Sequence, residues 1–251
     1  MSPFVTGARC FFQGFSLIAR PGLKRYVIVP LLINMAVFAG LIGLAGSAFI
    51  DLLNNILPEL PEWLAWLAWL LWLLFAALVA IVIFYTFTLV ANLIGAPFNS
   101  HLAKHVEIKL TGSVPPAADE SLVKGLWRDL SAELRKLAYF LLLVLPVAVL
   151  SLMLLFIPVV NGLIPFIWFI FGSWMLALEY ADYPLANHGL RFSEQRSLLR
   201  IHRLEALGFG AAATLATMIP GINFFVMPAA VAGATCLWSG NILQRSKEMR
   251  T

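Results

Sequence analysis

Residues 137–178 read LAYFLLLVLPVAVLSLMLLFIPVVNGLIPFIWFIFGSWMLAL and contain no Asp, Glu, Lys or Arg. A helix needs about 20 apolar residues to cross the hydrocarbon core of a bilayer, so this stretch of 42 is long enough for two crossings. Pro158 and Pro165 interrupt it near the middle, and proline breaks the interior of a helix. The stretch therefore predicts a helical hairpin, hairpin 1, made of two apolar helices and a turn.

Three further stretches lack charged residues: 26–50, 63–100 and 206–244. The first predicts one span. The second predicts another span, either as one long helix that overshoots the bilayer or with an interfacial lead-in. The four tryptophans between positions 63 and 72 favour the lead-in, because Trp prefers the headgroup layer. The third stretch is interrupted by Pro220 and Pro228 and predicts hairpin 2.

The turns of the two hairpins share the pattern I-P-x-x-N, at 157–161 and at 219–223. Both turns are apolar, with Asn161 and Asn223 as their clearly polar members. A turn inside a membrane must be shielded by protein or line a wet cavity. Two arrangements stay open, hairpins that cross the membrane fully and re-entrant hairpins that stop part-way. The apolar turns favour re-entrant hairpins.

The composition is that of an integral membrane protein. Of 251 residues, 61% are hydrophobic and 12% charged, against about 25% charged in soluble domains, and the mean hydropathy is +0.89. We expect a single all-α polytopic membrane domain, residues 1–251, with the first apolar run kept as a span rather than cleaved as a signal peptide. The net charge of +4 then reflects orientation in the membrane, and no nucleic-acid partner is expected.

The 17 basic residues lie in four segments outside the uncharged stretches. They are Arg9, Arg20, Lys24 and Arg25; Lys104, Lys109, Lys124, Arg128, Arg135 and Lys136; Arg191, Arg196, Arg200 and Arg203; and Arg245, Lys247 and Arg250. The remaining loop, 51–62, has three acidic residues and no basic one. With two single spans and two hairpins, all 17 face one side, which the positive-inside rule makes cytoplasmic, together with both termini.

Cytoplasmic helical segments are expected at 101–136 and 179–205. Leucines at 122, 126, 130, 134 and 137 follow helical spacing, and Phe4, Phe11, Phe15 and Ile18 form a looser stripe near the start. These stripes favour amphipathic helices on the inner leaflet over a groove for a partner protein.

Enzyme motifs such as HExxH, GxSxG and the P-loop are absent from the sequence, so we expect neither an enzyme nor a bound cofactor or metal. The predicted spans contain no ionisable Asp, Glu, Lys, Arg or His, which argues against a buried proton relay. Neutral polar residues are candidates either for contacts between helices or for a wet pathway that suits an anion. Those singled out are Asn34, Asn92, Asn99, Asn161 and Asn223.

The sharpest local element is Pro21-Gly22-Leu23-Lys24-Arg25, directly before the first span. Glycine lets a ligand approach the backbone, and free N–H groups at a helix N-terminus beside two cations form an anion site. The same residues would also serve as a positive-inside anchor. The residues alone leave these two interpretations equally open.

At these positions the chain resembles the CysZ family of bacterial sulfate permeases, from about Phe12 to Thr235. The resemblance rests on four pieces in order: Gly22-Leu23-Lys24-Arg25 with Pro30 and Asn34; Gly95-Ala96-Pro97-Phe98-Asn99-Ser100; Glu179-Tyr180-Ala181-Asp182-Tyr183-Pro184; and Ile219-Pro220-Gly221-Ile222-Asn223 running into 227–235.

The resemblance implies an oligomeric inner-membrane protein that imports sulfate, or a related oxyanion such as sulfite, for cysteine biosynthesis. It also implies two long spans with two part-penetrating hairpins, and sulfate binding at Gly22, Leu23, Lys24 and Arg25. The family motif often has arginine at both basic places, whereas Lys24 supplies a point charge instead of a bidentate fork. The alternative function is a non-transporting membrane scaffold whose basic loops recruit a cytoplasmic partner.

Overall fold

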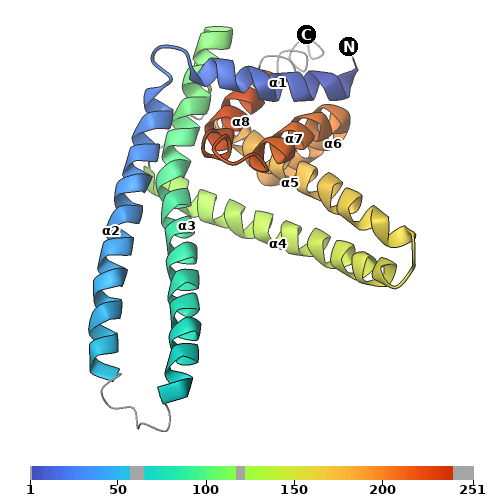
Figure 1. Ribbon diagram of the computed structural model, residues 1–251. Helices are drawn as coiled ribbons and strands as arrows, with labels where there is room; N and C mark the ends of the chain where they lie inside the picture. The colour runs from blue at the N-terminus through green and yellow to red at the C-terminus, as the bar shows by residue number, and fades with distance from the viewer. Residues whose placement is uncertain (1, 57–64, 117–121, 240–251) are drawn as a thin grey trace. The chain divides into compact units, whose positions relative to one another are not determined.

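The computed structural model describes residues 2–56, 65–116 and 122–239, and every regular element in these ranges is helical. The elements are α1 (Pro3–Ile18), α2 (Arg25–Ile56), α3 (Ala65–Thr111), α4 (Leu122–Leu155), the short 3₁₀ helix η3 (Val160–Leu163), α5 (Ile164–Ala186), α6 (Phe192–Ile201), α7 (Arg203–Thr217) and α8 (Asn223–Leu237) (Figure 1). The all-helical prediction is confirmed. The chain forms two compact units, one of Met1–Val27 with Asn99–Thr251 and one of Ile28–Phe98.

The unit of Ile28–Phe98 contains most of α2 and α3. At about 1.5 Å per residue, the 32 residues of α2 and the 47 of α3 each exceed the roughly 30 Å hydrocarbon core. α3 continues unbroken from Ala65 to Thr111. The predicted interfacial lead-in is therefore wrong within the described residues, because its tryptophan-rich part from Ala65 onward is the start of the same helix. The boundary expected between 100 and 101 also lies inside α3.

Helices α4 and α5 form hairpin 1 as predicted, with the turn at 156–163. Val159 adopts a left-handed φ of 71°, and Pro165 stands in the first turn of α5, where its missing N–H costs nothing. The indole N–H of Trp168 donates to the Ser151 hydroxyl at 3.0 Å and so joins the two helices. α4 begins at Leu122, so the expected boundary between 136 and 137 also falls within a helix.

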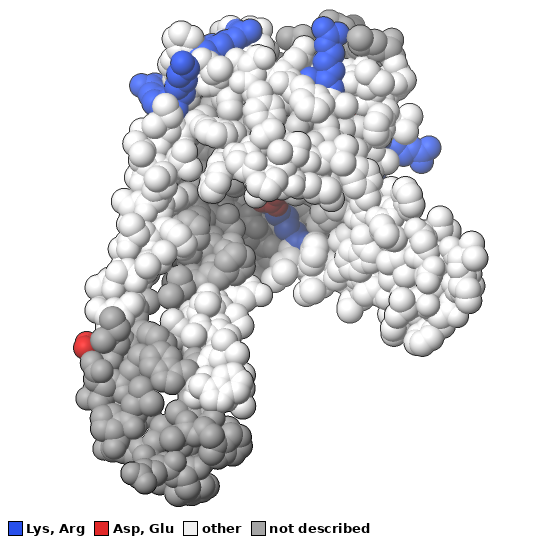
Figure 2. Space-filling view, viewed as in Figure 1, with Lys and Arg blue, Asp and Glu red and all other residues white. Residues whose placement is uncertain are grey.

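Long apolar helices occur in both units, and little of their surface is covered by protein. The span candidates Arg135–Leu155 and Val160–Ala186 have mean hydropathies of 2.6 and 1.6, and only 6% and 11% of their most apolar windows are buried. The far part of the α4–α5 hairpin shows no Lys, Arg, Asp or Glu on the face drawn in Figure 2. With Arg25–Leu44, three helices of the described chain are long and apolar enough to cross a membrane, as expected of a polytopic membrane protein.

Helices α7 and α8 form hairpin 2, whose turn passes through Gly221 at a φ of 82°. Each helix has 15 residues and is about 22 Å long. That length is short of the hydrocarbon core, unlike the helices of hairpin 1.

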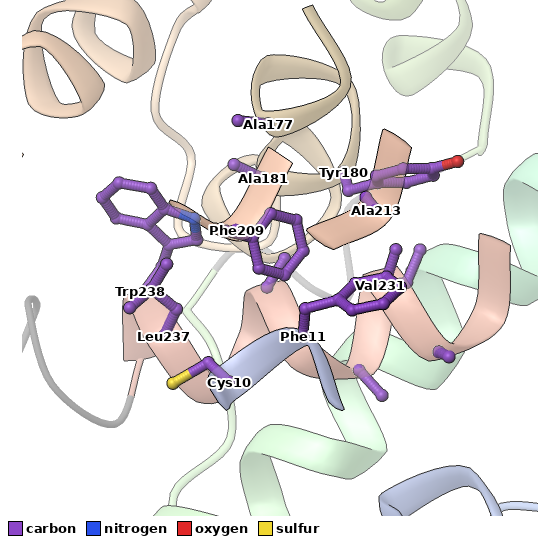
Figure 3. Close-up of a cluster of buried hydrophobic side chains, with 14 of the residues drawn as sticks. Cys10, Phe11, Ala177, Tyr180, Ala181, Phe209, Ala213, Val231, Leu237 and Trp238 are labelled. Atoms are coloured by element: carbon purple, nitrogen blue, oxygen red, sulfur yellow. The ribbon is translucent and has the colours of Figure 1, made fainter. Parts of the chain in front are cut away.

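The core of the larger unit lies where α1 crosses α7 and α8 (Figure 3). Phe11 is fully buried, and its ring meets that of Phe209 edge-on at 5.8 Å. Glycines permit the close crossing: a Cβ on Gly14 would lie 1.9 Å from the Ala229 carbonyl oxygen. The apolar stripe of α1 is thus covered largely by protein and not by lipid, although Phe4 stays 44% exposed. The leucine stripe from 122 to 134 lies outside the described side chains.

Candidate functional site

The predicted anion motif forms the turn between α1 and α2. Gly22 has a φ of 85°, in the left-handed region that favours glycine. The Leu23 N–H donates to the Arg20 carbonyl at 3.2 Å, and the Leu23 side chain is fully buried in the core. Leu23 therefore anchors the turn and holds the exposed residues on either side of it in place.

Three backbone N–H groups of this turn are candidate donors to a ligand. Within the described part of the chain, the N–H groups of Gly22, Lys24 and Arg25 have no hydrogen-bond partner, and all three residues are exposed. They precede or begin α2, where the helix dipole adds a partial positive charge. Free donors beside two cations match the needs of a tetrahedral oxyanion.

A third cation, Lys109 of α3, lies against the same turn. Its ammonium group donates a hydrogen bond to the Pro21 carbonyl oxygen. The Lys109 Nζ also lies 3.7 Å from the position of a Cβ built on Gly22. The site thus combines Lys24, Arg25 and Lys109 with one glycine. No sequence pattern points to Lys109, because 88 positions separate it from Pro21.

Arg25 is held by a relay of aromatic groups. Its guanidinium donates to the Tyr26 hydroxyl at 2.9 Å and lies 4.8 Å from the centre of that ring. The Tyr26 hydroxyl bonds the His105 Nε2 at 3.1 Å, and the His105 Nδ1 bonds the His101 carbonyl at 2.8 Å. Because that carbonyl only accepts, the His105 Nδ1 carries a proton and donates it to the His101 carbonyl. The relay fixes the Arg25 head group beside the turn.

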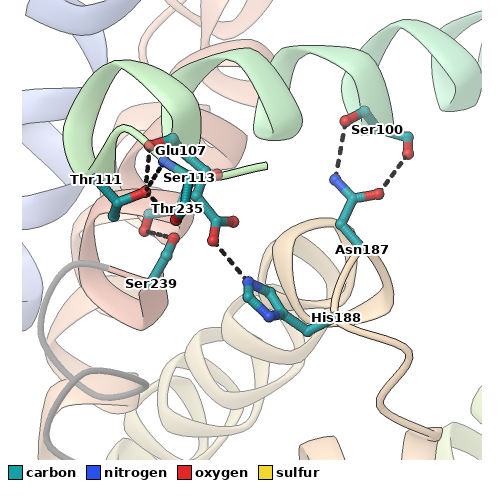
Figure 4. Close-up of polar contacts among 8 residues, drawn as sticks. All are labelled: Ser100, Glu107, Thr111, Ser113, Asn187, His188, Thr235 and Ser239. Carbon is teal, nitrogen blue, oxygen red and sulfur yellow. Dashed lines mark hydrogen bonds and ion pairs between the residues drawn. The ribbon is translucent and has the colours of Figure 1, made fainter. Parts of the chain in front are cut away.

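Buried polar contacts fix the end of α3 that carries Lys109 (Figure 4). The His188 Nε2 bonds the Glu107 Oε1 at 2.7 Å, and Glu107 is 3% exposed. Asn187 accepts from the Ser100 hydroxyl at 3.0 Å and donates to the Ser100 carbonyl at 3.1 Å. These contacts join α3 to the C-terminal end of α5, so the basic end of α3 is rigidly placed.

The structure describes the side chains of four of the five predicted asparagines. Asn161 and Asn223 are exposed at the tips of hairpins 1 and 2, as their pattern predicts. Asn99 is 5% exposed within the larger unit, and Asn34 is half-buried on α2 with its Oδ1 unpaired among the described residues. The side chain of Asn92 lies outside the described residues. No group of three or more metal-ligating side chains occurs in the described ranges.

Comparison with known proteins finds relatives that match nearly the whole chain, including the turn and Lys109. Residues 10–228 match the family described as sulfate transporter CysZ/etoposide-induced protein 2.4. The chain belongs to this CysZ family. A sulfate transporter CysZ of Pseudomonas aeruginosa is 43% identical over 238 residues, covering 94% of this chain and 95% of its own length. A protein of the same name from Pseudomonas fluorescens is 45% identical over 239 residues, which cover 94% of this chain and 94% of its own length. Another from Pectobacterium atrosepticum is 41% identical over 235 residues, which cover 93% of this chain and 84% of its own length.

The CysZ match begins within α1 and ends within α8. It therefore includes the turn at 22–25, the relay through His105 and the contact of Lys109. Three of the four short pieces that carry the resemblance in the sequence lie within this range, and the fourth begins within it and continues past its end at 228.

Proposed function

We propose that this chain is a sulfate permease with channel-like transport, which imports sulfate across the bacterial inner membrane for cysteine biosynthesis. The observation that carries the proposal is the exposed turn at 22–25 with the cations Lys24, Arg25 and Lys109. Its N–H groups at Gly22, Lys24 and Arg25 have no partner among the residues that the structure describes. CysZ relatives of nearly equal length are named sulfate transporters, which supports the same substrate class.

Sulfate fits this chemistry because it is a dianion whose four oxygens all accept hydrogen bonds. The backbone donors supply direction, and the side-chain cations supply charge. Lys24 and Lys109 are point charges, while Arg25 offers a planar fork held by Tyr26. Because all these groups are exposed, release of the anion needs no large unfolding step.

We further propose that α2 and α3 span the membrane, with both hairpins re-entrant and both termini cytoplasmic. The 15-residue helices of hairpin 2 support partial penetration, because they are shorter than the hydrocarbon core. The helices of hairpin 1 are long enough to cross, so its re-entrance rests on the family resemblance and on its apolar turn. Turns at membrane depth need protein cover, which favours a homo-oligomer embedded in membrane lipid.

Uptake of labelled sulfate into liposomes tests this function. Purified full-length protein should admit sulfate without ATP, with a rate that saturates and exceeds that of empty liposomes. The competing scaffold function predicts liposomes that stay sulfate-tight and a stoichiometric cytoplasmic partner in a pull-down. Sulfite and phosphate as competitors then measure the selectivity of the site.

A further inference from the structure

A groove with a volume of about 430 Å³ lies between α4 and α6, away from the turn described above. Arg135, Tyr139 and Leu142 line it from α4, and Phe192, Ser193 and Arg196 line it from α6. All six residues belong to the larger unit. None of them takes part in the proposed sulfate site.

The α4 side of the groove changes from charged to apolar over two turns. Arg135, Tyr139 and Leu142 follow at spacings of four and three, which place them on one face of the helix over about 10 Å. Arg135 is the first residue of the span candidate Arg135–Leu155, and Leu142 is 70% exposed. A charged group, an aromatic ring and an aliphatic side chain thus succeed one another from the end of the span inward.

Arg196 adds a second cation that is fixed in place. Its guanidinium lies 4.9 Å from the centre of the Tyr139 ring, a cation–π distance. Tyr139 is itself held by the Trp174 indole, which donates to its hydroxyl at 3.2 Å, and by an edge contact with Phe192. Within the described ranges, neither Arg135 nor Arg196 pairs with a carboxylate. Two guanidinium groups that pair with no carboxylate among the described residues therefore share one groove with the apolar side chains Leu142 and Phe192.

We propose that this groove binds one anionic phospholipid. Its phosphate lies between Arg135 and Arg196, near the Ser193 hydroxyl, and an acyl chain runs along Tyr139 and Leu142. Guanidinium groups match phosphate oxygens bidentately, and Arg and Tyr are typical of the headgroup level of a bilayer. A water-soluble anion would use the two cations but would leave the apolar part of the groove, at Leu142 and Phe192, without an occupant.

Native mass spectrometry of the purified full-length protein in detergent tests this site, with phosphatidylglycerol and phosphatidylcholine as probes. The wild type should retain one phosphatidylglycerol per chain in preference to phosphatidylcholine. Replacing both cations, Arg135→Gln with Arg196→Gln, should weaken phosphatidylglycerol binding by about tenfold and leave phosphatidylcholine unchanged. Arg200→Gln with Arg203→Gln removes two exposed charges outside the groove and should behave as the wild type.

Two further measurements keep the test independent of folding defects. The charge-retaining pair Arg135→Lys with Arg196→Lys should keep the preference for phosphatidylglycerol. Millimolar phosphate or sulfate should leave the lipid bound to the wild type, because neither anion fills the apolar part. A wild type without preference for the anionic lipid, or displacement of that lipid by phosphate alone, would overturn the proposal. An undiminished preference in a folded Arg135→Gln/Arg196→Gln variant would also do so.

Discussion

The ammonium group of Lys109 hydrogen-bonds the backbone carbonyl of Pro21, across 88 positions of the chain. The contact joins the last turn of α3 to the loop between α1 and α2, and it brings a third cation to a glycine already flanked by two. Both partners lie in the same compact unit. The anion site is therefore a tertiary arrangement, and the motif at 21–25 is only part of it.

Lys109→Met should weaken sulfate binding by about tenfold. The substitution removes a cation and frees the Pro21 carbonyl, and one charged hydrogen bond contributes about 1.5 kcal/mol. Lys109→Arg keeps the charge and should bind within a few-fold of the wild type. Equilibrium binding of labelled sulfate to protein in detergent measures both. Equal affinity of the Met variant and the wild type would remove Lys109 from the site.

Gly22→Ala should weaken sulfate binding while the protein stays folded. A left-handed φ costs a non-glycine residue about 1–2 kcal/mol, and the new methyl group would stand where the anion approaches the backbone. Its distance of 3.7 Å from the Lys109 Nζ is an ordinary contact, so no clash complicates the result.

Gly112→Ala is the matched control for that change. Gly112 also has a positive φ, of 72°, with open space around it, so the backbone cost is similar. Thermal unfolding should shift alike in the two variants, whereas sulfate binding should fall only in Gly22→Ala. Equal binding losses in both would mean that the effect comes from general destabilisation.

Tyr26→Phe should weaken sulfate binding by about fivefold. The ring remains beneath Arg25, but the hydroxyl that joins the guanidinium to His105 is lost, at a cost of about 1 kcal/mol. A double-mutant cycle with Arg25→Ala tests whether Tyr26 acts on sulfate binding through Arg25. If it does, Tyr26→Phe should have no further effect on sulfate affinity once the Arg25 side chain is absent. Additive losses in the cycle would show that Tyr26 does not act through Arg25.

Gly14→Ala should destabilise the larger unit by about 3 kcal/mol, because the new Cβ would overlap the Ala229 carbonyl. The change forces α1 away from α8 at the centre of the core. Gly172→Ala in α5 is the control, since nothing lies near its Cβ position. Thermal unfolding in detergent should separate them by a clear lowering of Tm in Gly14→Ala only, and similar Tm values would contradict the close crossing.

Much of the fold follows from hydrophobicity and proline alone. Uncharged stretches and the pattern I-P-x-x-N correctly predicted both hairpins, because Pro158 and Pro220 lie in the two turns. The second prolines differ: Pro165 stands in the first turn of α5, whereas Pro228 lies inside α8. The prediction of an interfacial lead-in at the tryptophan-rich start of the second stretch was wrong, because tryptophan marks an interface without marking a helix boundary. The sequence predicts that the stripe of α1 faces lipid, whereas protein covers most of it, because periodicity shows that a face is apolar but not what covers it.

The candidate site also has one part that the sequence predicts and one part that only the fold assembles. The turn at 22–25 was visible because its glycine and its two cations are contiguous in sequence. Lys109 and His105 were not, because only the packing of α3 against the turn brings them there. The same holds for the groove of Arg135 and Arg196, whose members lie on two helices about 60 positions apart.

We propose that the turn at 22–25 binds the sulfate that the protein transports. The initial rate of labelled sulfate uptake into liposomes tests this most directly. The turn variant carries both Lys24→Ala and Arg25→Ala, and the charge-matched control carries both Arg200→Ala and Arg203→Ala. The turn variant should fall to the rate of empty liposomes, and the control should transport as the wild type does. Wild-type uptake in the folded turn variant would contradict the claim and leave the motif as an anchor that sets orientation.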